Sequence, residues 1–180
     1  MNFIMRSSKR KLEIKTKGSE MTKLLGAAVL AVVLGATSLQ AITSKEALDV
    51  AEKNFPGSKI KDISMDVKKG ATFYEIESFK DNQKQEIKID AASGQIVKQK
   101  VKNKKFILPN EAIDFSKFAL SIDEAADKAL ALEAGWSLDE ADLDNKNGTW
   151  IYEVELKKGM SEKKVIINAQ TGEIIGNYTK

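Results

Sequence analysis

The 180-residue chain contains neither cysteine nor histidine. Without cysteine there can be no disulfide bond, thiolate nucleophile or thiolate metal site. Without histidine there is no imidazole metal ligand and no Ser-His catalysis, and the commonest general base is missing. We therefore predict a protein that is not an enzyme, with no catalytic residue, no metal site and no cofactor.

Both arginines of the chain and its net positive charge lie near the N-terminus. Residues 1–41 hold seven of the 29 Lys and Arg residues and two of the 26 Asp and Glu residues, which leaves 22 against 24 in residues 42–180. None of those 22 is arginine. A weakly acidic chain without arginine lacks the basic footprint of a phosphate-binding surface, so we expect no nucleic-acid partner.

The N-terminal region has the pattern of a secretory signal peptide. Lys23 precedes an unbroken apolar or small run over residues 24–35, which is followed by small residues. We predict cleavage after Ala41, with Ala36 as the fallback, and Met21 as the true initiator. The run is short for a membrane span, so no stable span is expected after cleavage; an uncleaved N-terminal anchor is the alternative. The protein is then exported, and is periplasmic, on the cell surface or secreted.

An internal repeat organises the rest of the chain. An offset of 78 residues aligns residues 43–102 with residues 121–180 without a gap, and about 17 of the 60 pairs are identical. The segment Tyr74-Glu-Ile-Glu77 falls on Tyr152-Glu-Val-Glu155. Chance similarity does not keep its register over such a span, so the chain contains two copies of one unit.

Each copy predicts one helix followed by an antiparallel meander. Thr43 with Glu46, and Ser121 with Glu124, form S/T-x-x-E capping boxes that begin a helix. Alternating apolar and polar residues predict the strands, with inward Tyr74 and outward glutamates beside it. The predicted strands cover residues 60–67, 72–79, 85–90 and 95–101, and residues 138–143, 149–156, 164–168 and 173–178. Lys69-Gly70 and Asn147-Gly148 predict the hairpin turns.

The predicted fold class is α+β: two tandem modules, each with one helix packed on a small antiparallel β-sheet of three to four strands. The predicted domains are a leader with its signal peptide (residues 1–41), module 1 (42–102), a linker (103–119) and module 2 (120–180).

Three further stretches have a structural interpretation. The lysine-rich residues 98–105 are typical of a solvated edge strand, where lysine discourages aggregation. Residues 142–148 superficially resemble a calcium loop, but Lys146 occupies the third ligand position, so a hairpin turn is the better interpretation. Residues 110–118 predict a short bridging helix whose Ile113, Phe115 and Phe118 pack on a module.

The repeated unit resembles the PepSY domain. The resemblance rests on Phe55-Pro-Gly57, on the two Tyr-Glu-x-Glu strands, and on the endings Asp90-Ala-Ala-Ser-Gly-Gln-Ile96 and Asn168-Ala-Gln-Thr-Gly-Glu-Ile174. It implies an extracytoplasmic setting, since members occur in propeptides of thermolysin-type metallopeptidases and as stand-alone exported proteins. It also implies a peptidase-inhibitory role and defines no catalytic residue.

These patterns together predict an exported, non-catalytic PepSY-type binding protein that regulates or inhibits an extracytoplasmic peptidase. The alternative is an envelope structural or sensing protein that binds wall polymer or a small ligand, and a carboxylate-based hydrolase is the third hypothesis. The expected partner is a protein, with a secreted peptidase as the candidate; the sequence assigns no oligomeric state. The candidate partner-binding residues are Tyr74, Glu75, Glu77, Tyr152, Glu153 and Glu155.

Overall fold

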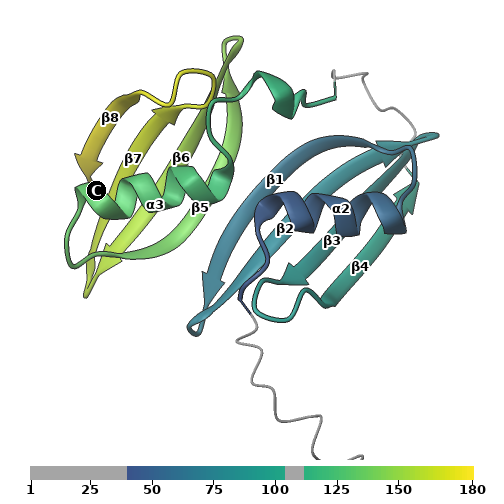
Figure 1. Ribbon diagram of the computed structural model, residues 1–180, viewed down its shortest axis with the longest axis horizontal. Coiled ribbons are helices and arrows are strands. Elements are labelled where there is room, and N and C mark those ends of the chain that lie inside the picture. The colour runs from purple at the N-terminus through teal and green to yellow at the C-terminus, as the bar shows by residue number, and fades with distance from the viewer. Residues whose placement is uncertain (1–39, 104–111) are drawn as a thin grey trace, which may run out of the picture. The chain divides into compact units, whose positions relative to one another are not determined.

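The computed structural model describes residues 40–103 and 112–180. The predicted start at Met21 and the signal core lie outside the described residues. Two α-helices and eight strands fill the described part, in the order α2 (Ser44–Asn54), β1 (Lys59–Lys68), β2 (Ala71–Lys80), β3 (Gln83–Asp90), β4 (Ile96–Asn103), α3 (Ile122–Leu132), β5 (Ser137–Lys146), β6 (Thr149–Lys158), β7 (Ser161–Asn168) and β8 (Ile174–Thr179), with a short 3₁₀-helix η1 (Phe115–Lys117) before α3 (Figure 1).

Both helices begin at the predicted capping boxes. The hydroxyl of Thr43 accepts a hydrogen bond from the N–H of Glu46, and the carboxylate of Glu46 accepts one from the N–H of Thr43 at 2.7 Å. Ser121 and Glu124 repeat both contacts at the start of α3, again with a 2.7 Å bond to the carboxylate. Each box satisfies two N–H groups that a helix start would leave without a partner.

The two predicted hairpin turns are also present. Asn147 and Gly148 have φ values of 55° and 88° between β5 and β6, and Lys69 and Gly70 have values of 56° and 81° between β1 and β2. This left-handed conformation at both central residues matches the twist of the strands that it joins, and Asn-Gly adopts it readily. The stretch that resembles a calcium loop is therefore a hairpin, as expected.

The prediction of two modules, each with its own small sheet, was wrong. The eight strands form one continuous antiparallel sheet in the order β4-β3-β2-β1-β5-β6-β7-β8. The architecture is a single, mainly β sheet with two short helices rather than two separate α+β modules. β1 and β5 would otherwise be edge strands with unpaired backbone N–H and C=O groups, and their mutual pairing satisfies part of both edges. The boundaries 42–102 and 120–180 stay predictions.

The junction between β1 and β5, which we call the seam, is short. It pairs Ser64 with Asp142, Met65 with Ala141 and Asp66 with Glu140. Because Ser64 and Asp142 are equivalent at the 78-residue offset, each repeat meets the other around its own copy of the same position. The antiparallel register is thus centred on equivalent positions, and the ladder extends from that pair in one direction only, toward Asp66 and Glu140.

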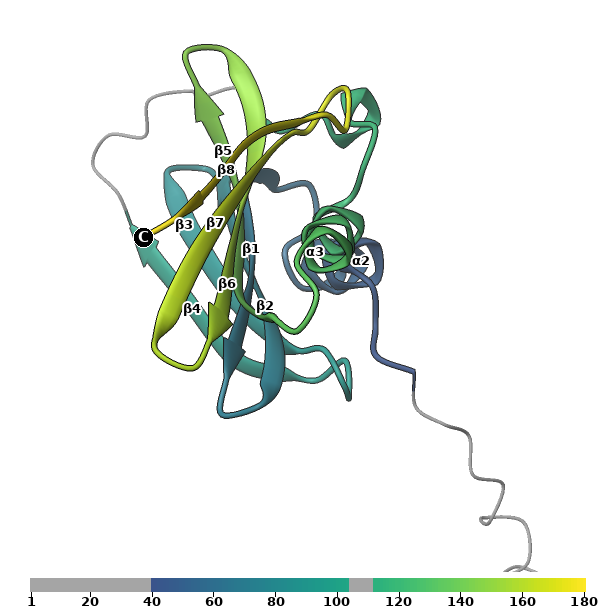
Figure 2. The same cartoon turned by 90° about the vertical axis from the view of Figure 1, so that its left-hand side faces the viewer.

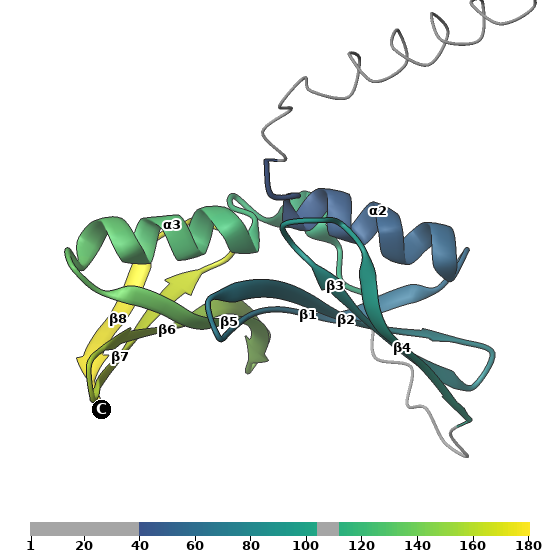
Figure 3. The same ribbon diagram turned by 90° about the horizontal axis from the view of Figure 1, so that it is seen from below.

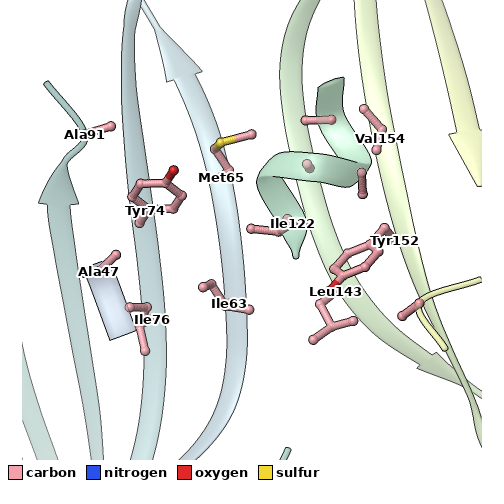
Figure 4. Packing of buried hydrophobic residues seen from close by; sticks show 14 of the residues in the cluster. Ala47, Ile63, Met65, Tyr74, Ile76, Ala91, Ile122, Leu143, Tyr152 and Val154 are labelled. Carbon is pink, nitrogen blue, oxygen red and sulfur yellow. The ribbon is translucent and has the colours of Figure 1, made fainter. Parts of the chain in front are cut away.

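Both helices lie on the same face of the sheet (Figures 2 and 3). Beneath them, alternate strand residues form one buried cluster that includes Tyr74, Ile76, Tyr152 and Val154. Ile122, at the start of α3, lies in the middle of this cluster and is 2% exposed (Figure 4). The apolar core therefore runs under both helices and past the seam.

Asp123 of α3 joins the two repeats by hydrogen bonds. Its carboxylate accepts from the N–H and the hydroxyl of Ser44, at 2.9 and 2.6 Å, and from the hydroxyl of Tyr74. The hydroxyl of Tyr152, the equivalent of Tyr74, instead donates to the C=O of Leu120 at 2.7 Å. Asp123 thus caps the start of α2 from the other repeat.

The segment before α3 packs against both repeats. The N–H of Ile113 donates to the C=O of Ile60 in β1, and Ile113 is buried. Phe118 lies 5.8 Å from Trp150, measured between ring centroids. The predicted packing of Ile113, Phe115 and Phe118 is confirmed, although the helical part is only the three-residue η1. Asn110 and Glu111 lie outside the described residues.

Candidate functional site

Strand alternation divides the six candidate partner-binding residues between two faces. Tyr74 and Tyr152 point under the helices and are 3% and 1% exposed. Their glutamate neighbours lie on the opposite face of the sheet, which no described element covers and which we call the open face. A partner on the open face would contact glutamates and would not reach the two tyrosines.

The glutamates of the first repeat belong to a network with lysines. Lys88 of β3 bridges Glu75 at 2.6 Å and Asp66 at 3.1 Å. Lys84, four residues earlier on the same face of β3, pairs with Glu77. Lys88 lies directly opposite Glu75 in the β2–β3 pair. These carboxylates are neutralised by their cross-strand neighbours.

The glutamates of the second repeat have an equivalent network with different residues. Lys164 of β7 bridges Glu153 at 2.6 Å and Glu155 at 3.1 Å, and Lys180 also contacts Glu155 at 2.6 Å. The hydrogen bond from Lys180 leads the contacts that lower the pKa of Glu155. The hydrogen bond that Lys164 donates to Glu153 leads the contacts that raise the pKa of Lys164. All four predicted glutamates are therefore held as ion pairs.

Three acidic residues at the seam differ from these glutamates. Within residues 40–103 and 112–180, no lysine forms an ion pair with Asp62, Glu140 or Asp142. Partial burial, with the charges of Glu140 and Asp62, raises the pKa of Asp142 to about 7. Partial burial also raises the pKa of Glu140, with the nearby Asp66 as the next cause. Above the raised pKa of Asp142, the seam thus carries negative charge that no lysine of the neighbouring strands neutralises.

Sequence reasoning missed this acidic seam, although part of its signal is visible. Glu140, Asp142 and Asp144 alternate along one strand, which places all three carboxylates on one face. The sequence does not reveal that Asp62 and Asp66 of the other repeat lie beside them, because that proximity arises only from the β1–β5 pairing. Like charges on directly opposed strands disfavour pairing, as with Asp66 and Glu140.

A cleft of about 900 Å³ opens beside the seam, where β1 and the β5–β6 hairpin diverge. We call it the seam cleft. Asp62 of β1 and Asp142 of β5 line it. Phe118, from segment 112–118, and Trp150 of β6 line it as well. The cleft exists because β1 and β5 pair over three residues only, so the two strands separate beyond Ser64.

The described residues contain neither a group of acidic side chains placed to bind a metal ion nor a helix that could span a membrane. In residues 40–103 and 112–180 no group of three or more acidic side chains is placed to hold a metal ion. No helix in those same ranges has the length and apolar character needed to cross a membrane.

The sheet has two edges of different character. β4 lies at one edge, as predicted for the lysine-rich stretch, and Lys98, Lys100 and Lys102 are exposed on it. Lys104 and Lys105 lie outside the described residues. β8 forms the other edge, where Ile175 and Tyr178 are about half exposed. An exposed edge offers backbone groups that an extended peptide can pair with.

Comparisons with known proteins agree with this repeated arrangement. The chain is 29% identical over 136 residues to the protein YkoJ of Bacillus subtilis (strain 168), a match that covers 75% of this chain and 73% of YkoJ. The crystal structure of CD1622 from Clostridium difficile 630 superimposes with a TM-score of 0.67 at 18% identity, and covers 82% of this chain and 98% of that one. The fold is therefore shared with CD1622.

The C-terminal domain of YpeB from Bacillus megaterium also matches, with 17% identity, a TM-score of 0.29, and coverage of 78% of this chain and 66% of that one. The family model PepSY, described as "Peptidase propeptide and YPEB domain", matches residues 41–100 and again residues 119–178. With two matches in tandem that together span well over half of its length, this chain belongs to the PepSY family.

Proposed function

We propose that this protein is an exported, non-catalytic binding protein that docks a protein partner on its open sheet face, and that the partner is an extracytoplasmic peptidase which it regulates or inhibits. The observation that carries the proposal is the open face itself. It runs across both repeats, no described element covers it, and it presents charged side chains held in fixed positions by ion pairs. Such a face suits recognition, since charge patterns set orientation and partner choice.

The chemistry of the face supports binding rather than turnover. General acid–base catalysis by two carboxylates needs one proton donor and one acceptor with separated pKa values. The glutamates of the Tyr-Glu-x-Glu strands are instead bridged by lysines, as Glu153 and Glu155 are by Lys164. Export is supported by the signal-peptide pattern of residues 1–41, and the peptidase by the family's description, which names peptidase propeptides.

The test uses the chain from Ile42 onward and purified extracytoplasmic peptidases of the same organism. We expect a dose-dependent change in the rate of peptide hydrolysis, which is reduced when Glu75→Lys and Glu153→Lys reverse charges on the open face. The control Asp49→Lys makes the same charge change on the exposed side of α2. Unchanged hydrolysis at micromolar protein, or equal effects of both kinds of variant, would count against the proposal.

The lysine-rich edge favours a second candidate, an envelope protein that binds anionic wall polymer. Lys98 and Lys100 make no ion pair within the described ranges, so their charges are available to such a polymer. Retention on immobilised teichoic acid that falls with added NaCl and is lost in Lys98→Gln/Lys100→Gln would favour this candidate. Retention that is independent of salt would argue against it.

A further inference from the structure

The seam carries more negative charge than its own fold requires. Three carboxylates there have no lysine partner within residues 40–103 and 112–180, whereas the acidic groups on either side are bridged by lysines. Uncompensated like charge beside a strand pairing lowers stability. A feature that opposes the fold at one place is expected where the protein has a function to perform.

The charged residues that line the seam cleft are also mainly acidic. Six acidic residues line it against the two basic residues Lys61 and Lys117: Asp62, Glu77, Asp114, Asp142, Asp144 and Glu153. Four of the six have lysine partners, as Asp114 has Lys117 at 3.3 Å. The two without a lysine partner are Asp62 and Asp142, one from each repeat. The cleft is therefore electronegative where the repeats meet.

The rest of the cleft wall favours an organic cation over a metal ion. Phe118 and Trp150 line it from the helix side of the sheet, where Trp150 and Tyr152 share a face, and aromatic rings attract a guanidinium or ammonium group. A volume of about 900 Å³ far exceeds what one ion needs, and within the described residues no acidic group is arranged to coordinate one. A planar guanidinium can meet a carboxylate and an aromatic ring together.

We propose that the open face at the seam is a docking surface for a basic segment of the partner protein, and that an arginine or lysine side chain of that segment enters the seam cleft between Asp62 and Asp142. The inference rests on the proposed function for the identity of the partner, and it names the chemistry by which that partner is recognised. Both repeats contribute, since Asp62 belongs to β1 and Asp142 to β5. One repeat alone would not form the site.

The two tryptophans of the chain provide the measurement. Trp150 lines the cleft, whereas Trp136 lies outside it beside Lys163. The ¹⁵N-labelled protein is titrated with the capped peptide Gly-Arg-Gly-Arg-Gly and with its Gly-Gln-Gly-Gln-Gly counterpart. We expect the indole signal of Trp150 to shift to saturation with the arginine peptide, that of Trp136 to stay in place, and the glutamine peptide to have no effect.

Variants locate the binding. At pH 8, above the raised pKa of Asp142, Asp62→Asn and Asp142→Asn each remove one unpaired charge and also relieve repulsion, so they should fold; we expect each to weaken binding at least fivefold. Glu162→Gln removes the same charge from β7 outside the cleft and should leave binding unchanged. Equal losses in all three variants would mean general attraction by net charge and would overturn the proposal.

Two other results would also overturn it. One is the absence of any Trp150 shift at saturating arginine peptide. The other is a Trp150 shift produced by CaCl₂ but not by the peptide, which would mean a metal site. This titration uses no peptidase, so its result is separate from that of the hydrolysis assay. If the arginine peptide binds and no peptidase is affected, the proposed peptidase partner is rejected and the docking site stands. If a peptidase is affected and the arginine peptide does not bind, the docking site is rejected and the peptidase partner stands.

Discussion

The two repeats use the same residue types to build their helices and hairpins, yet they differ where they face each other. Both helices begin at a Ser/Thr–Glu capping box, and both Tyr-Glu-x-Glu strands bury the tyrosine. At the start of the helices, however, Ser44 of the first repeat is equivalent to the buried Ile122 of the second. Local structure is therefore repeated, while the contact surface has been made complementary.

The two repeats also differ in net charge. Residues 42–105 hold 14 lysines against 10 acidic residues, and residues 119–180 hold seven against 12. The difference teaches that joining two copies through one sheet requires unequal residues at equivalent positions. Asp123 shows this most clearly: it accepts hydrogen bonds from Ser44 and Tyr74, and its equivalent, Lys45, could not accept any.

The largest expected effect tests whether the repeats unfold together. Ile76, 2% exposed in the first repeat, is equivalent to Val154 in the second. Ile76→Ala should lower the free energy of unfolding by about 2–5 kcal/mol, because it leaves a cavity in the shared core. Both tryptophans belong to the second repeat, so tryptophan fluorescence should report the lowered midpoint of urea unfolding although the change lies in the first.

Far-UV circular dichroism of the same samples is the control. Coincident transitions would mean that the continuous sheet unfolds as one unit. A fluorescence midpoint that stays at the wild-type value, with a separate earlier circular dichroism transition, would show that the repeats are energetically independent.

The next effect concerns the two equivalent tyrosines. Tyr74→Phe removes a hydrogen bond to the Asp123 carboxylate and should cost about 1.5–3 kcal/mol, whereas Tyr152→Phe removes one to a neutral C=O and should cost about 0.5–1.5 kcal/mol. Urea unfolding of both variants measures the difference. The reverse order would mean that the link through Asp123 contributes little to joining the repeats.

A smaller effect depends on pH and on the seam. Asp142 faces Asp62 of β1, Glu140 of its own strand, and Glu153 and Glu155 of β6, and its pKa is raised to about 7. A carboxyl with a raised pKa favours the folded state while it is protonated, so its contribution is full near pH 4 and is lost as pH rises through 7. Asp142→Asn should flatten this decline and add roughly 1 kcal/mol at pH 8, since water screens a partly exposed group.

Asp144→Asn is the matched control on the same strand. The hydrogen bond from Lys146 leads the contacts that lower the pKa of Asp144, so its contribution is present above about pH 4 and is lost as pH falls. Its removal should lower stability at neutral pH. Chemical denaturation from pH 4 to pH 8 distinguishes the two variants, and parallel profiles would contradict the assignment of the charge effect to the seam.

The smallest effect compares the two lysine bridges. Lys88→Gln and Lys164→Gln each break two ion pairs on the open face and should each cost less than about 1 kcal/mol. Thermal unfolding at low salt should resolve both losses, and 1 M NaCl should reduce them. A decrease of several kcal/mol in the free energy of unfolding of either variant would mean that its ion-pair network contributes substantially to the stability of the fold.

Much of the fold could be predicted from short-range patterns. The capping boxes place the starts of α2 and α3, Asn147-Gly148 places a hairpin, and alternation separates Tyr74 from Glu75. Each of these features depends on residues a few positions apart. The lysines opposite the glutamates were predictable for the same reason, because neighbouring strands of a meander are joined by tight turns.

The candidate site was predictable only in part. Glu75, Glu77, Glu153 and Glu155 reach the open face as expected, whereas the seam cleft needs Asp62 and Asp142, which are 80 positions apart along the chain. No periodicity indicates that β1 and β5 become neighbours. The prediction of two separate sheets was wrong for this reason.

The sequence by itself determined the repeat, the helix starts, the turns, the inward and outward faces of each strand, and membership of a family, because all of these depend on local pattern and order. Only the tertiary structure decided that two edge strands would pair into one sheet, that Asp123 would reach Ser44, and that acidic residues of both copies would meet beside a cleft. The physical reason is that unpaired backbone groups at a strand edge are satisfied by whichever partner packing brings near, and that choice is made by the whole fold.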